Sequence, residues 1–468
     1  MTATGWVADV LVIFGISGDL ARKMTIPALY RLERRGALTC PVVGVASTPM
    51  TTRELASRAR QAIQDAGESV DDAVFARLIK RLTYLPGDVT DPQLYKALAV
   101  QLSGTRRPLY YLATPPSLFA PIVERLDAAG LLGDARVAVE KPFGRDLASA
   151  RDLNARLSQV LDDRQLLLVD HFLGKEPVIE IEYLRFANFA MADLWNRNSV
   201  EAIQITMAED FGAADRGRFY DAVGALRDVV QNHLLQVLAL VTMDPPIGAS
   251  ADDLRDKKAE ALKSVQPADP EHCVRGQYDG YLQVPGVEPN SDTDTFIALR
   301  LDIDSWPWAG VPVFIRAGKE LPVRDTEVRL ILRHTPRLRF LPDAARVEAN
   351  QIVLRISPDP GLRLQLSALD EHQAWRPVRL DSVFARELGE PQAPYERLLY
   401  DALTGDDRLF ARQDAIQESW RILQPLIAYP PPASRYAAGT WGPPQADALL
   451  SGYPPWQRPW LPDGGRSA

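Results

Sequence analysis

The sequence contains little cysteine and no long apolar run. Cys40 and Cys273 are the only cysteines in 468 residues, which excludes a disulfide framework, and no Cys/His spacing indicates a zinc site. The first apolar run, residues 10–14, is too short for a signal peptide or a membrane span. Carboxylates and histidines are not grouped at ligand spacings, so we expect no metal site. These absences predict a cytoplasmic protein of a reducing compartment, without a membrane segment.

An excess of positive charge is absent as well. Lysine and arginine number 53 against 61 aspartates and glutamates, which gives a net charge of −8. A net acidic chain is a poor general binder of nucleic acid or anionic membrane, although it can hold a local basic pocket for an anionic metabolite. The hydrophobic share of 46% and the charged share of 24% are globular values that exclude wholesale disorder. The length predicts two or three domains of roughly 100–200 residues each.

The first third of the chain alternates short apolar runs with helical stretches. The runs lie at residues 10–14, 41–46, 82–85, 109–113, 137–140 and 166–170. Strands that alternate with helices imply a parallel sheet covered on both faces, with right-handed connections. We therefore predict an α/β domain over residues 1–174.

The pattern changes after about residue 175. Period-2 alternation with turn residues between the runs favours a mostly antiparallel sheet. Its predicted strands lie at residues 201–207, 295–303, 313–316, 327–332, 351–356 and 362–367. Helices are expected at 224–241 and 251–265, and two late helices, 395–404 and 414–426, are expected to pack on this sheet. We predict a β+α domain over residues 175–468.

The C-terminal tail is rich in proline and tryptophan. Nine of the 37 prolines lie between Pro430 and Pro462, a composition that usually indicates disorder. Trp441, Trp456 and Trp460 are interleaved with them, and such rings prefer burial. We expect an extended tail that packs onto the body of the protein and is ordered at least to Trp441.

A glycine-rich turn follows the first apolar run and precedes a helical stretch. Such a turn lets backbone N–H groups approach a pyrophosphate at the start of the helix. The spacing is G-x-x-G and not the full G-x-G-x-x-G fingerprint, so a tight turn with an aspartate cap is the alternative. The candidate cofactor-binding residues of this turn are Gly15, Ser17, Gly18, Asp19 and Leu20.

The end of the second apolar run bears on the choice between NAD and NADP. An acidic residue there binds the ribose hydroxyls of NAD, and an arginine nearby accommodates the 2′-phosphate of NADP. This chain has Ser47 and Thr48 at that position, which are neither acid nor arginine. Their hydroxyls can donate to a phosphate, and Arg22, Lys23 or Arg53 can add positive charge. Ser47 is the cofactor-binding candidate, and the choice between NADP and NAD stays open here.

Two further motifs follow predicted strands of the first domain, where catalytic groups gather in open α/β sheets. Lys141 lies in EKPFG, and a surface lysine at a turn is the alternative. Asp170, His171 and Lys175 lie in DHFLGKE. If a helix begins by His171, then His171 and Lys175 share a face, as a phosphate clamp requires, and Asp170 points away from them and can orient a second imidazole. A helix start capped by the aspartate is the alternative.

Two motifs of the second domain carry polar residues. RDVVQNHLLQ lies inside a helical run and places Asp228 and His233 in a polar cluster, although a core histidine satisfied by a neighbour fits equally well. GVPVFIRAGK ends a strand with Arg316 and Lys319. Both side chains suit an anionic substrate, and a charged surface is the alternative.

Together these motifs resemble those of the glucose-6-phosphate dehydrogenase family. EKPFGRD, DHFLGKE, RDVVQNHLLQ and GVPVFIRAGK follow GISGDLA in the family's order. The resemblance extends from about Val10 to Trp441, and its supporting runs are YYLATPPSLF, LRFAN, LWNR, SADDLRDKK, VRGQY and YERLLYDAL. It implies a Rossmann domain followed by a β+α domain on a large antiparallel sheet. It also implies assembly as a homodimer or a homotetramer.

The resemblance further implies a reaction and its site. The reaction is oxidation of C1 of β-D-glucose 6-phosphate to the 6-phosphogluconolactone, the first step of the pentose phosphate pathway. The hydride is transferred to NADP, and NAD is the alternative cofactor. His233 matches the family's general base and Asp170 its partner. A neutral imidazole with a pKa near 6.5 suits removal of the O1 proton, and Asp170 holds its tautomer. The implied substrate contacts are Lys141, His171, Lys175, Glu209, Asp228 and Lys319, of which Lys141 also lies near the nicotinamide.

Three departures from the family pattern leave the substrate and cofactor preference open. Phe172 replaces the usual tyrosine, and losing one hydrogen bond to a charged group costs roughly 1.5–3 kcal/mol unless another donor replaces it. Ser357 stands near the usual glutamine, and Ser47 or Thr48 replaces the usual arginine. The alternatives are a paralogue that acts on a related sugar, with NAD as a possible cofactor, and a non-catalytic sensor of nucleotide or sugar phosphate. The intact general base argues against the sensor, and nothing in the sequence indicates the structural NADP site that some members have.

Overall fold

The computed structural model describes the chain except residues 1–4, 215, 337–346 and 462–468. The chain forms two compact units. The first unit contains Met1–Lys175, Pro246–Asp256 and Gln392–Gln417. The second unit contains Glu176–Pro245, Lys257–Pro391 and Glu418–Ala468. Along the chain, the first unit is first left after Lys175, one residue from the predicted boundary between residues 174 and 175. The functions assigned to the two predicted domains stay a prediction.

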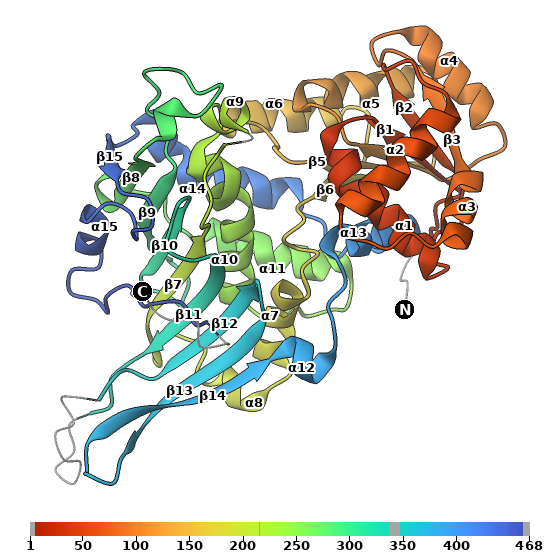
Figure 1. Ribbon diagram of the computed structural model, residues 1–468. Coiled ribbons are helices and arrows are strands. Elements are labelled where there is room, and N and C mark those ends of the chain that lie inside the picture. Colours follow the sequence, from red (N-terminus) through yellow and green to blue (C-terminus); the bar gives the residue numbers. More distant parts are fainter. Residues whose placement is uncertain (1–4, 215, 337–346, 462–468) are drawn as a thin grey trace. The chain divides into compact units, whose positions relative to one another are not determined.

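A six-stranded parallel sheet forms the centre of the first unit, as the alternating pattern predicts. Its order is β3-β2-β1-β4-β5-β6, and every neighbouring pair is parallel (Figure 1, red to gold). The strands are β1 Val10–Phe14, β2 Val42–Ala46, β3 Leu82–Pro86, β4 Pro108–Leu112, β5 Arg136–Glu140 and β6 Leu166–Val169. All residues of β1, β2, β4, β5 and β6 are buried, as expected for strands covered on both faces. The strand order reverses between β1 and β4, which is where such sheets bind nucleotides.

Helices surround this sheet, and their starts follow ordinary capping chemistry. The helical segments of the N-terminal part are η1 Ala21–Thr25, α1 Ile26–Arg34, α2 Thr52–Asp65, α3 Asp72–Arg81, α4 Pro92–Gln101, η2 Pro116–Leu118, α5 Phe119–Ala128 and α6 Leu147–Leu157. Thr51 caps α2 with a capping box that includes Glu54. Asp71 and Asp91 cap α3 and α4 by accepting backbone N–H groups of the first turn with their carboxylates.

A late segment of the chain completes the first unit. Helix α13, Pro394–Thr404, buries Leu398, Leu399, Ala402 and Leu403 in the same core cluster as the residues of β1 and α1. The expectation that this helix packs on the second sheet is therefore wrong. Its apolar face fits the core of the first unit, and sequence order does not determine that choice. Ala411 then donates its N–H to the carbonyl of Leu168 and pairs with the edge strand β6.

A nine-stranded sheet forms the second unit, and it is mostly antiparallel as predicted. Its order is β14-β13-β12-β11-β7-β10-β9-β8-β15, with parallel pairs only at β7–β10 and β8–β15. The strands are β7 Val200–Ala208, β8 Cys273–Tyr278, β9 Phe296–Leu301, β10 Val313–Gly318, β11 Asp325–Leu332, β12 Gln351–Ser357, β13 Gly361–Leu369, β14 Trp375–Val383 and β15 Ala433–Tyr436. Strands β8, β14 and β15 are additions to the predicted set.

The remaining helices belong wholly or partly to the second unit. They are α7 Glu176–Phe186, α8 Phe189–Ala192, α9 Gly217–Asp221, η3 Leu226–Leu234, α10 Leu235–Thr242, α11 Ala251–Lys263, η4 Pro270–His272, η5 Tyr281–Gln283, α12 Phe384–Leu388, α14 Gln413–Ala428 and α15 Gln445–Ala448. Segment η3 contacts β10 and runs into α10, which confirms the predicted helix at 224–241. Both α11 and α14 continue from one unit into the other. In the described part of the chain, every helix is too short or too polar to cross a membrane.

The C-terminal tail is ordered well beyond Trp441. Strand β15 pairs with the edge strand β8, and the side chain of Gln204 binds the carbonyls of Pro454 and Pro455. Further on, the N–H of Trp460 donates to the carboxylate of Glu327 at 2.9 Å. The expectation of a tail packed onto the body is confirmed, and its order extends to the last described residues.

Candidate active site

The glycine turn after β1 is built so that only glycine fits its first position. Gly15 has φ of +82°, and a Cβ there would lie 2.3 Å from the carbonyl oxygen of Ala113, just after β4. The N–H of Gly18 donates to the carbonyl of Gly15 at 2.9 Å and closes the turn. Leu20 directly precedes the π-helical segment η1. The turn thus lies at the reversal of strand order, and its bare backbone fits a pyrophosphate.

The predicted cofactor residues of the turn lie beside the end of β2. The hydroxyls of Ser17 and Thr48 are 3.4 Å apart, and Tyr84 donates its hydroxyl to the carbonyl of Thr48 at 2.5 Å. Arg22 forms ion pairs with Asp19 and Asp65 and therefore has less charge to offer. Among the described residues, Arg53 on the first turn of α2 makes no ion pair. The hydroxyls at the end of β2, together with the exposed Arg53 a few residues later in the sequence, suit the 2′-phosphate of NADP at this edge of the sheet.

A buried carboxyl lies at the end of β5, next to Lys141. Glu140 accepts a hydrogen bond from the hydroxyl of Tyr111, and both side chains are almost fully buried. Burial, with a smaller contribution from the charge of Asp170, raises the pKa of Glu140 to about 7, against the lowering effects of the Tyr111 hydrogen bond and the Lys141 charge. Glu140, the first residue of the motif EKPFG, is therefore a buried carboxyl next to Lys141.

The motif DHFLGKE forms a turn rather than the start of a helix. The N–H of Phe172 binds the carboxylate of Asp170 at 3.0 Å, and Leu173 donates to the carbonyl of Asp170 at 3.0 Å. Helix α7 begins only at Glu176. The shared helical face expected for His171 and Lys175 is thus absent, because the aspartate closes a tight turn first.

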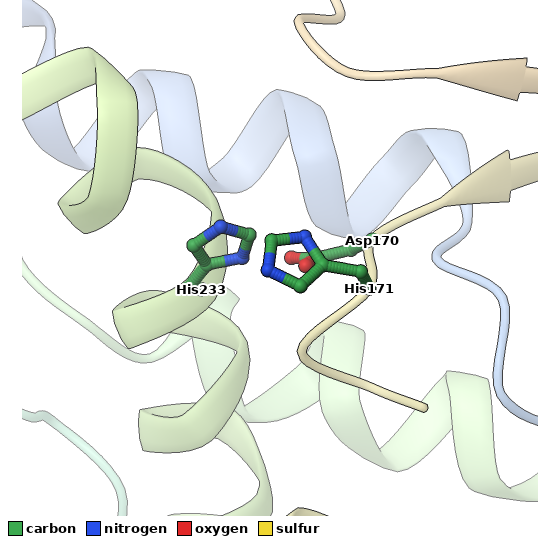
Figure 2. A group of neighbouring side chains, drawn as sticks. All are labelled: Asp170, His171 and His233. Atoms are coloured by element: carbon green, nitrogen blue, oxygen red, sulfur yellow. The ribbon is translucent and has the colours of Figure 1, made fainter. Parts of the chain in front are cut away.

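An aromatic ring replaces that shared face. The Nζ of Lys175 lies 3.8 Å from the ring centroid of Phe172, and the ring of His171 meets Phe172 edge-on at 5.5 Å. Phe172 is only 2% exposed, so its buried ring is a fixed contact for the Lys175 ammonium and for the ring of His171. Figure 2 shows Asp170 and His171 in the turn that follows the strand, whereas His233 lies on a helical segment.

His233 lies on a π-helical segment whose start is tied to a buried aspartate. The carboxylate of Asp294 accepts from the N–H of Leu226 at 2.9 Å and from Arg275 at 3.2 Å. Within the segment, Asn232 donates its amide to the carbonyl of Arg227 and accepts the N–H of His233 at 2.6 Å. His233 is 1% exposed. Single π-helical turns occur often at functional sites, and this one places the candidate base in the interior.

Glu209 and Lys319 come together at the ends of two parallel strands. Glu209 follows β7 and Lys319 follows β10, and Nζ lies 2.6 Å from Oε2. The rings of Phe211 and Tyr220 face the same ammonium group at 4.8 Å and 5.0 Å. Neither ring gave a signal in the sequence, because the four residues come from three separate segments. The arrangement is a partly buried cation in a shell of a carboxylate and two rings.

Arg316 does not join Lys319, in contrast to the expectation that both serve an anionic substrate. Its guanidinium lies 4.3 Å from the ring centroid of Trp441 and 4.5 Å from that of Trp456. Burial lowers its pKa to about 10. The C-terminal tail therefore uses this arginine for packing.

In each unit the structure groups part of the predicted site. In the first unit, the glycine turn, Ser47, Lys141 and the Asp170–Lys175 turn all follow the carboxyl ends of neighbouring parallel strands. In the second unit, Glu209 and Lys319 pair, and Asp228 and His233 share η3. A parallel sheet of order 3-2-1-4-5-6 with a glycine turn at its reversal defines a dinucleotide-binding domain of the Rossmann class.

Comparisons with known proteins give the family. Residues 12–180 match "Glucose-6-phosphate dehydrogenase, NAD binding domain", and residues 182–458 match "Glucose-6-phosphate dehydrogenase, C-terminal domain". Glucose-6-phosphate 1-dehydrogenase 1 of Mycobacterium tuberculosis and that of Mycobacterium bovis are each 63% identical over 460 residues, which cover 98% of both chains. The chain belongs to the glucose-6-phosphate dehydrogenase family.

Solved structures agree with this assignment. The glucose-6-phosphate 1-dehydrogenase of Mycobacterium avium is 62% identical, with a TM-score of 0.93 over 97% of this chain and 99% of that one. A glucose-6-phosphate dehydrogenase in complex with its substrate glucose-6-phosphate is 32% identical, with a TM-score of 0.90 over 98% and 100%. The predictions of family, fold class and NAD(P)-dependent oxidoreductase activity are confirmed.

Proposed function

We propose that this chain oxidises the C1 hydroxyl of β-D-glucose 6-phosphate to 6-phospho-D-glucono-1,5-lactone with NADP, the first step of the pentose phosphate pathway. The observation that carries the proposal is the match over 98% of the chain to glucose-6-phosphate 1-dehydrogenases at 63% identity. A relative of known structure was solved with glucose-6-phosphate bound, and its fold covers 98% of this chain.

His233 is the proposed general base, with Asp170 as its partner. Hydride cannot easily leave C1 until the O1 proton is being removed, and a neutral imidazole does this near neutral pH. Asp170 holds the tautomer that presents the basic nitrogen and stabilises the imidazolium that forms. The burial of His233 supports this role, because a base shielded from water keeps its geometry. Bound NADP supplies the ring carbon that accepts the hydride.

The proposed phosphate ligands are His171 and Lys175. Both contact the ring of Phe172, which replaces the family's usual tyrosine, so this chain keeps two of the family's phosphate donors and lacks the tyrosine hydroxyl. The remaining proposed substrate contacts are Lys141, Glu209, Asp228 and Lys319. Lysine and glutamate in an ion pair can donate to one sugar hydroxyl and accept from another, which fits the Glu209–Lys319 pair.

NADP is the proposed preferred cofactor, although the usual arginine is absent. The proposed contacts are Gly15, Ser17, Gly18, Asp19, Leu20, Ser47 and Lys141. The end of β2 offers the hydroxyls of Ser47 and Thr48 and no carboxylate that would repel a 2′-phosphate.

A homodimer in the cytoplasm is the proposed physiological state, and a tetramer of such dimers is the alternative. Strands β13 and β14 pair Leu366 with Val378 and Leu364 with Leu380, and three of these four side chains are at least 42% exposed. Such an apolar sheet face supports an isologous contact between copies. Both cysteines are free and buried, which supports a reducing compartment.

The first test measures initial rates with glucose 6-phosphate, with NADP and NAD in parallel. Strong reduction of NADP is the expected result, with a kcat/KM of about 10⁴–10⁸ M⁻¹s⁻¹. A clear preference for NAD would contradict the cofactor proposal and make the missing arginine decisive. No rate with either cofactor would contradict the substrate proposal, and other sugar phosphates would then be screened.

A further inference from the structure

The turn that carries His171 and Lys175 packs closely against α13, a helix from the late part of the chain. A Cβ at Gly174 would lie 2.8 Å from the carbonyl oxygen of Pro394 and 2.8 Å from the side chain of Leu398. Only glycine permits this approach of the turn to the helix. The start of α13 therefore lies directly against the proposed phosphate-binding turn, within the first unit.

Tyr395, the second residue of α13, contacts His171 through its ring. The two ring centroids are 5.8 Å apart, and the planes differ by only 13°. This stacked arrangement is a favourable geometry for aromatic pairs. It uses the face of the imidazole and not the two ring nitrogens. A phosphate ligand needs those nitrogens, so the contact leaves the function of the imidazole intact.

The phenol of Tyr395 lies near a buried carboxyl. Burial, and then the charges of Glu140 and Asp170, raise the pKa of Tyr395. Glu140 itself accepts a hydrogen bond from the hydroxyl of Tyr111. Glu140 ends β5 and His171 follows β6, so Tyr395 lies beside the ends of two neighbouring strands, while Leu398 and Leu399 anchor α13 in the core.

We propose that Tyr395 is a positioning residue for substrate binding: its ring, held by the packing of α13 against the turn, sets the orientation of the His171 imidazole toward the phosphate. This inference rests on the proposed function of His171 as a phosphate ligand. Tyr395 acts through His171 and has no contact of its own with the reacting atoms. The residue therefore affects the affinity for glucose 6-phosphate and not the chemical step.

The test compares Tyr395→Leu with Tyr395→Phe and with Tyr400→Leu, a control on the exposed side of the same helix. Tyr395→Leu is expected to raise both KM and the calorimetric Kd for glucose 6-phosphate about two- to tenfold, the range of an aromatic pair. The kcat value and the Kd for NADP should stay within about twofold of wild type. Tyr395→Phe keeps the ring and should show a smaller rise, and Tyr400→Leu none.

A second arm asks whether the effect passes through His171. The double variant His171→Ala with Tyr395→Leu should bind glucose 6-phosphate as weakly as His171→Ala alone. An additive loss would overturn the inference. If His171→Ala itself leaves KM unchanged, the proposed phosphate role of His171 is wrong, and that outcome is independent of the double variant.

A spectroscopic arm tests the stacking without turnover. The chain has five histidines, so ¹³Cε1-histidine labelling gives five imidazole signals, and His171→Ala identifies one of them. Loss of the Tyr395 ring should shift the His171 signal and leave the His233 signal in place. An unchanged His171 signal in Tyr395→Leu would overturn the inference. If that variant does not fold, Tyr395→Met, which keeps a similar volume without the ring, decides in the same way: a shifted signal with a raised Kd supports the inference, and an unchanged signal or an unchanged Kd overturns it.

Discussion

The two units use the same geometric principle with very different sheets. In the first unit every strand is parallel, so the carboxyl ends of all six strands lie at one edge, and all the candidate residues of the Rossmann domain follow those ends. The second sheet is antiparallel except for two pairs, and one of these pairs, β7–β10, carries Glu209 and Lys319. Neighbouring antiparallel strands run in opposite directions, so the carboxyl ends of two adjacent strands lie together only in a parallel pair. The comparison teaches that local parallel pairing determines where residues that follow two adjacent strands converge, whatever the class of the whole sheet.

The means of support differ between the units. In the first, tight turns and backbone hydrogen bonds hold the site, as at Gly15 and Asp170. In the second, an ion pair inside a shell of Phe211 and Tyr220 does so. The site of the first unit should therefore be sensitive to glycine substitutions that add a Cβ atom. The site of the second unit should be sensitive to substitutions that remove a charge.

The largest expected effect is loss of the candidate base in the second unit. His233→Asn should lower kcat about 10²- to 10⁴-fold, because the O1 proton then has no acceptor of suitable pKa. The change in KM for glucose 6-phosphate should be small. Initial rates at saturating substrate measure both, and His272→Asn, at a half-exposed histidine, is the matched control. Unchanged turnover would show that another group is the base.

The next effect tests the side-chain support of the second unit. Lys319→Gln removes the cation and leaves the partly buried Glu209 without its partner, so KM for glucose 6-phosphate should rise about 10- to 100-fold. Steady-state kinetics measure the change, with the exposed Lys263→Gln as control. A variant with wild-type KM would mean that this pair is only structural and would break the comparison with the first unit.

A glycine pair tests the backbone support of the first unit. Gly15→Ala forces a Cβ against the carbonyl of Ala113, so affinity for NADP should fall at least about tenfold and the free energy of unfolding by about 2–4 kcal/mol. Gly36→Ala shares the positive φ but meets no atom within 4 Å, so it should cost only about 1–2 kcal/mol. Urea unfolding and fluorescence titration with NADP measure both quantities. Equal effects of the two variants would show that the close approach is unimportant.

The smallest effect is a pH dependence of stability in the first unit. The pKa of Glu140 is raised to about 7, so the native state holds this proton more tightly than the unfolded state does. Its contribution to the free energy of unfolding is therefore full at low pH and falls as the pH rises from about 4.5 to 7, by about 2–3 kcal/mol.

Glu140→Gln should remove this dependence. The free energy of unfolding of the wild type and of the variant is measured between pH 5 and 8. The difference between these two free energies should shrink as the pH falls. Asp401, whose pKa burial also raises to about 7, has the same sign and cancels in the comparison. A difference that is constant over this range would contradict the assignment to Glu140.

Local signals in the sequence account for much of the fold. All six strands of the first sheet fall on runs of apolar residues between turns or helices, because a strand buried on both faces must be apolar throughout. The strands that the pattern misses are β8, β14 and β15. Strand β14 contains Pro377 and is largely exposed, and β15 lies in the proline-rich tail, so neither shows the alternation of a half-buried strand.

Local signals in the sequence likewise account for one part of the candidate site and not for the other. The glycine turn, the aspartate of the DHFLGKE turn and the candidate base could be named from the sequence, because each is a residue type with a local backbone or chemical requirement. Only the tertiary structure decided that Lys319 pairs with Glu209, that Arg316 lies between two tryptophans, and that Tyr395 stacks on His171. Each of these contacts joins segments far apart in the chain. Packing of apolar faces brings such segments together, and spacing along the sequence does not encode it.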